Sequence, residues 1–232
     1  GEIPSVASQL KNLGYETFSI HPYRANGWNR NKVYEYFGFD TSYFKESFTG
    51  APILREYTTD LATYQKIVDI YTAKTPGQPM FVFDVTMQNH SSYSKEYDNF
   101  TPDVEVLGSN GSAKLLERYL SLIKVSDEAF SQLVGYFSQV DEPTVILMFG
   151  DHQPSVEQEF LDMAYGVSED GMTMEQYMDK FKVPFVIWAN YPLTGEQPGI
   201  TSLNFLAQYV LRDAGIRTSA FGSYLWDFMK TI

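Results

Sequence analysis

The feature that most constrains the fold is an alternation between short runs typical of buried strands and longer amphipathic stretches. Four such runs predict buried strands over residues 15–20, 80–86, 144–149 and 183–189. The stretches between them carry apolar residues at helical spacing, most clearly over 113–140. Parallel neighbouring strands need crossovers of this length, so the pattern predicts an α/β fold with a doubly wound, largely parallel sheet flanked by helices.

Capping and breaking residues predict further helices and one irregular region. The aromatic segment 39–57 has no helical or strand period and is predicted to be irregular. The sequence shows no repeat and no low-complexity tract, so residues 1–232 are predicted to form a single domain. The further helices are predicted over 5–12, 29–37, 59–74 and 201–214.

Composition excludes several classes of protein. Seventeen Lys and Arg against 29 Asp and Glu give a net charge of −12, which repels nucleic acid and argues against it as a partner. The absence of Cys excludes a disulfide framework, a thiolate zinc site and a Cys nucleophile. No apolar run approaches the length of a membrane span. Because Gly1 directly precedes a helix-like stretch, we expect the chain to be a fragment of a longer protein.

All three histidines follow the carboxyl ends of predicted strands. They are His21, His90 and His152. The carboxyl ends of parallel strands meet at one edge of a sheet, where ligands bind in such folds. The three histidines are therefore predicted to share one site. The alternative is that each makes only local hydrogen bonds in its own loop.

Two of these strand ends carry chemically specific neighbours. Asp151 and His152 follow Gly150, and an adjacent carboxylate and imidazole suit a divalent metal such as manganese or zinc. The pair is only half of a coordination sphere, and the alternative is that Asp151 caps a turn. After His21 come Trp28 and Arg30, and a guanidinium near a helix start favours an oxyanion such as phosphate. The alternative places Trp28 in the core and uses Arg30 in a surface ion pair.

Familiar catalytic motifs are absent from the sequence. It has no P-loop, no GxGxxG after a strand, no GxSxG and no HExxH. Three segments instead resemble the lipoteichoic acid synthase family of the alkaline phosphatase and sulfatase superfamily. They occur in the family's order and are GYETFSIHPYRANGWNRNKVYEYFGFD, FVFDVTMQNHSSY and TVILMFGDHQPS.

The resemblance implies a role for individual residues. Asp151 and His152 would be metal ligands, usually for manganese in this family, with zinc and magnesium as alternatives. Ser155 lies one position from a substrate-contacting Ser of the family. The residues that would contact the phosphate or glycerol of the substrate are His21, Trp28, Arg30 and His90, of which Arg30 and His90 are the candidate catalytic residues.

The family's nucleophilic Thr and a metal-binding Glu lie upstream of the matched segments. The resemblance therefore implies that residues 1–232 are a partial catalytic domain, inactive alone, of a phosphoglycerol transferase that acts on a lipid phosphodiester such as phosphatidylglycerol. It also implies a monomer on the extracytoplasmic face of a bacterial membrane, anchored by a segment outside this chain, with phospholipid or glycerol-phosphate polymer as substrate. The alternatives are a sulfatase or phosphodiesterase-type hydrolase and a non-catalytic binding module.

Overall fold

The computed structural model describes residues 3–231 and divides them into two compact units. The first unit lies within Gly1–Leu133 and His152–Lys182, and the second within Val134–Asp151 and Val183–Ile232. Each unit is described by itself below. The prediction that residues 1–232 form one domain stays a prediction.

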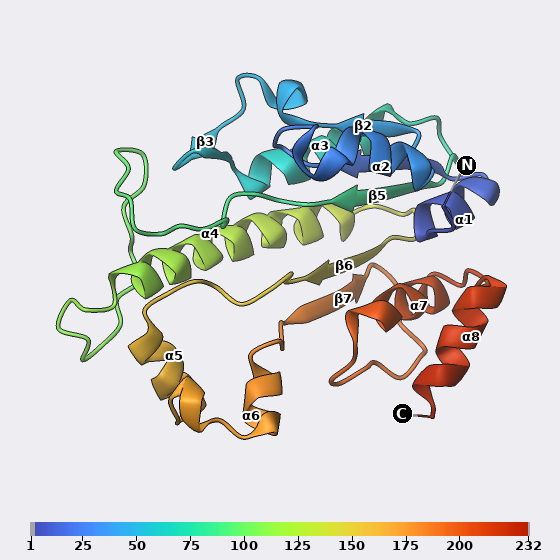
Figure 1. The fold of residues 1–232 in the computed structure, drawn as a ribbon. Helices are drawn as coiled ribbons and strands as arrows, with labels where there is room; N and C mark the ends of the chain where they lie inside the picture. Colours follow the sequence, from blue (N-terminus) through green and yellow to red (C-terminus); the bar gives the residue numbers. More distant parts are fainter. Residues whose placement is uncertain (1–2, 232) are drawn as a thin grey trace. The chain divides into compact units, whose positions relative to one another are not determined.

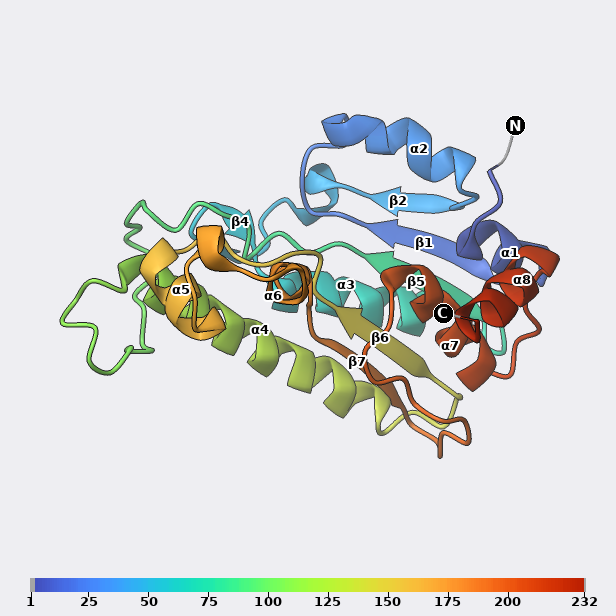
Figure 2. The same cartoon turned by 60° about the horizontal axis from the view of Figure 1, so that its bottom comes forward.

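The first unit is built on a parallel sheet of three strands in the order β2-β1-β5. Figure 2 shows β1 (Glu16–Ile20), β2 (Thr41–Tyr43) and β5 (Met80–Asp84) side by side and pointing the same way. The predicted parallel sheet is confirmed here. The prediction for segment 39–57 was wrong in part, because β2 lies within it.

Helices cover both faces of this sheet, as a doubly wound fold requires. On one face Ile70 of α3 (Asp60–Ala73) packs with Ile20 of β1 in the core. On the other face the Tyr34 ring of α2 (Arg30–Tyr36) lies 6.4 Å from the ring of Phe83 in β5. Residues of alternating direction along each strand thus bury against different helices.

A long helix, α4 (Lys114–Phe137), begins in the first unit on a carboxylate cap. Glu157 accepts hydrogen bonds from the backbone N–H of Leu115, at 2.6 Å, and of Leu116, at 3.0 Å. These donors have no partner inside the helix, and a negative charge suits a helix N-terminus. The remaining elements of this unit are α1 (Val6–Asn12), η1 (Gly27–Asn29), η2 (Lys45–Phe48), β3 (Ile53–Leu54), β4 (Tyr57–Thr58), α5 (Gln158–Tyr165), η3 (Glu169–Gly171) and α6 (Met174–Asp179).

The second unit contains one pair of strands and two helices. The strands β6 (Val145–Phe149) and β7 (Phe185–Ala189) pair side by side in antiparallel register, and α7 (Leu203–Asp213) packs against β6 and against α8 (Ala220–Met229) (Figure 1). Both strands were predicted, but β7 runs opposite to the parallel direction that the pattern favours. Helix α8 was not predicted. None of the described helices combines the length and apolar character needed to cross a bilayer.

Candidate functional site

His21 is fixed at the carboxyl edge of the parallel sheet by its contacts to both neighbouring strands. Its backbone N–H donates to the carbonyl of Tyr43, at 2.8 Å. Its Nδ1 lies 2.9 Å from the carbonyl oxygen of Val85, directly after β5. Because a carbonyl only accepts, this contact places the proton on Nδ1 and leaves Nε2 as an acceptor in the neutral ring.

The surroundings of His21 keep its imidazole neutral. The residue is only 1% exposed, and Nε2 has no hydrogen-bond partner among the described residues. Burial lowers the pKa of His21, the hydrogen bond to Val85 opposes this, and the charges of Arg30 and His90 lower it further. The net pKa lies below 6.5, so the ring offers an acceptor at neutral pH. Arg30 and His90 therefore lie within electrostatic reach of His21.

Arg30 is the first residue of α2, at the end of the connection that follows β1. Its Nη1 donates to the carbonyl of Gly27 at 3.2 Å. Burial raises the pKa of Tyr34, and the nearby Arg30 charge opposes this rise. Just before Arg30, Trp28 and Asn29 have φ values of 54° and 52°, a left-handed conformation that few residues adopt. The Trp28 side chain is 87% exposed, so the interpretation of Trp28 as a core residue is wrong.

His90 lies in the loop after β5 and is exposed. Its Nδ1 donates to the carbonyl of Ser91 at 2.7 Å, and its ring centre lies 5.7 Å from that of Tyr57. Tyr57 lies 6.2 Å from Tyr23, whose ring in turn lies 6.3 Å from His21. A continuous row of aromatic rings thus joins the two histidines, and the sheet edge carries His21, Arg30 and His90 together.

The predicted metal ligands lie where the two units divide. Asp151 and His152 are exposed and follow β6, and the division falls between them. Ser155 is exposed in the next residues. Nowhere in residues 3–231 do three His, Asp or Glu side chains gather into a metal-binding group. Two donors do not complete the coordination sphere of zinc or manganese. We therefore derive no step of the chemistry from a metal, and the roles of Asp151, His152 and Ser155 stay predictions.

A buried pair of carboxyl groups close to the site was not predicted from the sequence. Asp84 ends β5 opposite Ile20, and both of its carboxylate oxygens are buried with no partner among the described residues, although part of the residue is exposed. Burial raises the pKa of Asp84 to about 7, with Thr63 opposing and Asp60 adding to the rise. Burial also raises the pKa of Asp60, which accepts a hydrogen bond from the Ser126 hydroxyl at 2.6 Å. The sequence signal for this pair is Asp84 itself, an acidic residue inside an otherwise apolar strand.

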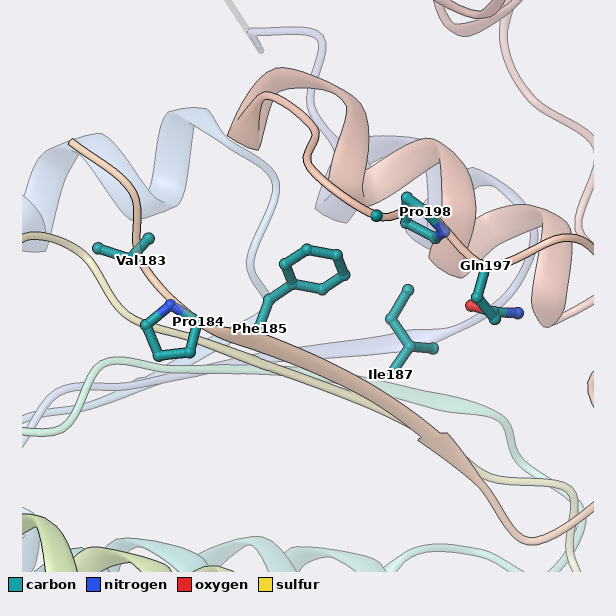
Figure 3. Close-up of a pocket in the computed structure, with 7 residues that line it drawn as sticks. Val183, Pro184, Phe185, Ile187, Gln197 and Pro198 are labelled. Carbon is teal, nitrogen blue, oxygen red and sulfur yellow. The ribbon is translucent and has the colours of Figure 1, made fainter. Parts of the chain in front are cut away.

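The second unit has a hollow of about 430 Å³ beside β7 (Figure 3). Figure 3 shows Phe185 and Ile187 pointing to the same side of the strand, toward Pro198. Its lining carries no titratable side chain, so the hollow offers no acid, base or nucleophile. None of the predicted site residues lines it; the lining consists of Val183, Pro184, Phe185, Ile187, Gln197, Pro198 and Gly199.

Comparison with known proteins defines the family. A model of the Sulfatase family matches residues 1–216, and the chain belongs to this family. Among curated proteins, the putative cyclic beta-1,2-glucan modification protein of Rhizobium meliloti is 28% identical over 227 residues, 96% of this chain and 35% of that protein. The lipoteichoic acid synthase-like YvgJ of Bacillus subtilis is 26% identical over 195 residues, 82% of this chain and 30% of that protein.

Solved structures agree with this assignment of the fold. The Streptococcus pyogenes phosphoglycerol transferase GacH, in complex with sn-glycerol-1-phosphate, superposes with a TM-score of 0.71 at 21% identity, covering 94% of this chain and 54% of that chain. The lipoteichoic acid synthase LtaP of Listeria monocytogenes gives 0.68 at 17% identity, with 94% and 54% covered. The predicted alkaline phosphatase/sulfatase-like fold and the resemblance to lipoteichoic acid synthases are confirmed. The chain spans between a quarter and about a third of the curated relatives it matches.

Proposed function

We propose that this chain forms the substrate side of the active site of a phosphoglycerol transferase that acts on a lipid phosphodiester such as phosphatidylglycerol. The observation that carries the proposal is the grouping of His21, Arg30 and His90 at the carboxyl edge of the parallel sheet. A guanidinium beside two imidazoles suits a phosphodiester, whose non-bridging oxygens accept hydrogen bonds and carry the negative charge.

Each of the three side chains is assigned to a different group of the substrate. Arg30 supplies donors for the phosphoryl oxygens, on which negative charge increases in the transition state. Neutral His21 has its proton on Nδ1, so its Nε2 accepts a hydrogen bond from a hydroxyl, such as that of glycerol. Because Nε2 is buried, a ligand reaches it only after a neighbouring side chain moves. His90 is exposed, and its imidazole is the group that would give or take a proton at the phosphoester oxygen.

The overall reaction needs a hydroxyl nucleophile from outside residues 1–232. The nucleophile loses its proton, its oxygen bonds to phosphorus, the bond from phosphorus to the diacylglycerol oxygen breaks, and the diacylglycerol oxygen takes a proton. An acceptor hydroxyl then loses its proton and bonds to phosphorus, and the bond from phosphorus to the enzyme oxygen breaks as that oxygen takes a proton back. The proposal includes a divalent metal, manganese in the first instance, with Asp151 and His152 among its ligands. It also includes a membrane anchor outside this chain, an extracytoplasmic location and a monomeric state.

The test compares two arginines in the same loop of the full-length protein that contains this chain. Release of diacylglycerol from fluorescent phosphatidylglycerol is measured for the wild type, Arg30→Gln and the control Arg24→Gln. Arg24 is exposed and lies over the Tyr23 ring at 6.0 Å. We expect Arg30→Gln to lower kcat/KM about 100-fold, the usual effect of removing one transition-state donor. Arg24→Gln is expected to change it less than about threefold, in the range of surface substitutions.

Each other outcome has a definite meaning. Equal losses in the two variants would refute the role given to Arg30. Turnover of a sulfate ester without turnover of phosphatidylglycerol would show a sulfatase-type hydrolase. Binding of glycerol phosphate by a full-length protein that turns over neither ester would favour a non-catalytic binding module.

A further inference from the structure

We propose that Arg55 is a positioning residue that fixes the loop carrying His90. The relevance of this role to catalysis rests on the function proposed above, whereas the role itself rests on contacts within the first unit. Arg55 is one of the two residues that join β3 to β4, and its guanidinium reaches across to the segment that follows β5.

The Arg55 guanidinium binds three carbonyl groups of that segment. Its Nη2 donates to the carbonyl of Gln88 at 2.6 Å and to that of His90 at 2.8 Å. Its Nη1 donates to the carbonyl of Ser92 at 3.1 Å. One planar group with fixed donor directions therefore sets the relative positions of alternate peptide groups on both sides of His90.

The guanidinium is itself held tightly. Arg55 is 6% exposed, and its charge lies 5.5 Å from the ring centre of Tyr57 and 5.6 Å from that of Tyr93. These rings attract the cation and restrict its movement. The Tyr57 ring also lies beside the His90 imidazole, so it contacts both the Arg55 guanidinium and the imidazole whose loop Arg55 holds.

The backbone conformation of Arg55 is unfavourable for an arginine, which indicates a role for its side chain. Its φ is 57°, a left-handed conformation that hairpin turns normally assign to Gly, Asn or Asp. An Arg here carries a conformational penalty that Gly would avoid. The contacts of its guanidinium with the loop carrying His90 offset that penalty.

A second set of contacts holds the start of the loop, before the carbonyl groups of His90 and Ser92 that Arg55 binds. The Ser126 hydroxyl of α4 accepts hydrogen bonds from the side chains of Gln88, at 3.1 Å, and Asn89, at 2.8 Å. Ser126 donates in turn to Asp60. From His90 to Ser92 the carbonyl contacts of Arg55 tie the backbone to the β3–β4 hairpin.

The experiment reads the His90 ring directly in residues 1–232. The chain has three histidines, so ¹⁵N and ¹³C spectra contain three imidazole spin systems, which His→Gln variants assign. Arg55→Gly removes the guanidinium while suiting the positive φ, and Arg55→Lys keeps the charge without the planar fork. Arg212→Lys is the matched control, because Arg212 also lies over two rings, Tyr209 at 5.1 Å and Trp226 at 5.7 Å, in the second unit.

We expect both Arg55 variants to shift the His90 ring signals and to speed amide exchange over residues 88–93 at least about tenfold, because the loop loses its fixed partners. The His21 signals and the spectrum of Arg212→Lys in this loop should stay as in the wild type. Any folded Arg55 variant with unchanged His90 signals and exchange would overturn the proposal, as would Arg212→Lys shifting His90 equally.

Activity provides a separate readout in the full-length protein. There Arg55→Lys is expected to lower kcat on phosphatidylglycerol about tenfold or more, because a small displacement of a reacting group has effects of this size. A His90 shift without activity in the wild type would leave the positioning role intact and refute the proposed function instead.

Discussion

Asp84 makes the stability of this protein depend on pH in an unusual direction. Burial raises the pKa of its carboxyl from 3.8 to about 7. Between these values the folded state holds a proton that the unfolded state has lost, so the contribution of Asp84 to the free energy of unfolding falls as pH rises from about 4 to about 7. Each pKa unit corresponds to about 1.4 kcal/mol, so the full effect is up to about 4 kcal/mol.

The perturbation is Asp84→Asn, which replaces the protonated carboxyl by a neutral group of the same shape. The assay is urea unfolding followed by circular dichroism at pH 5 and pH 8.5. The variant is expected to lose most of the difference in unfolding free energy between the two pH values, whatever the amide itself contributes, because that contribution is the same at both. Asp69→Asn on the exposed side of α3 is the control and should keep the wild-type difference.

An Asp84→Asn variant that keeps the wild-type pH dependence would refute this reasoning. That result would assign the effect to other groups, the first of which is Asp60, whose pKa burial also raises.

Two further predictions concern groups of the first unit. Burial lowers the pKa of His21, so the unfolded state binds the proton more readily, and the contribution of His21 to the free energy of unfolding falls as pH drops below about 6.5, opposite in sign to that of Asp84. In urea titrations His21→Gln should therefore make the free energy of unfolding fall more steeply than in the wild type as pH rises from 5 to 7, and an unchanged pH dependence would contradict this. Glu157→Ala removes the carboxylate that caps α4, so it should lower the free energy of unfolding by about 1–2 kcal/mol and speed amide exchange at Leu115 and Leu116. Glu157→Gln should lower the free energy of unfolding less. Unchanged amide exchange at Leu115 and Leu116 in Glu157→Ala would refute the cap.

The helices and strands that could be predicted are those in which buried residues form an apolar run or recur at regular spacing in the sequence. Strands β6 and β7 are continuously apolar, β5 is apolar up to Asp84, and α4 has a long one-sided pattern. Strand β1 alternates Phe18 and Ile20 with polar residues. Strand β2 is only Thr41–Tyr43, which is too short to show a run or an alternation. The antiparallel direction of β7 depends on how the chain returns to β6, which no local pattern specifies.

The sequence predicts those site residues that directly follow a strand. His21 and His90 follow strands that are neighbours in one parallel sheet, and the carboxyl ends of parallel strands lie at the same edge of the sheet. Arg55 could not be found in this way, because its role depends on contacts with residues 88–92, more than 30 positions away. Asp84 was visible as an acid in an apolar run, but only the folded structure shows that both of its oxygens are buried.

The double attachment of His21 to the strands on either side has a consequence for how such a protein can diverge. One hydrogen bond leads to Tyr43 and the other to Val85, and neither partner belongs to the loop that follows His21. Residues 22–29 can therefore change in length or composition while the imidazole keeps its place and its tautomer. Related proteins can therefore change which ligand group the loop of residues 22–29 accepts, while His21 Nε2 remains the hydrogen-bond acceptor.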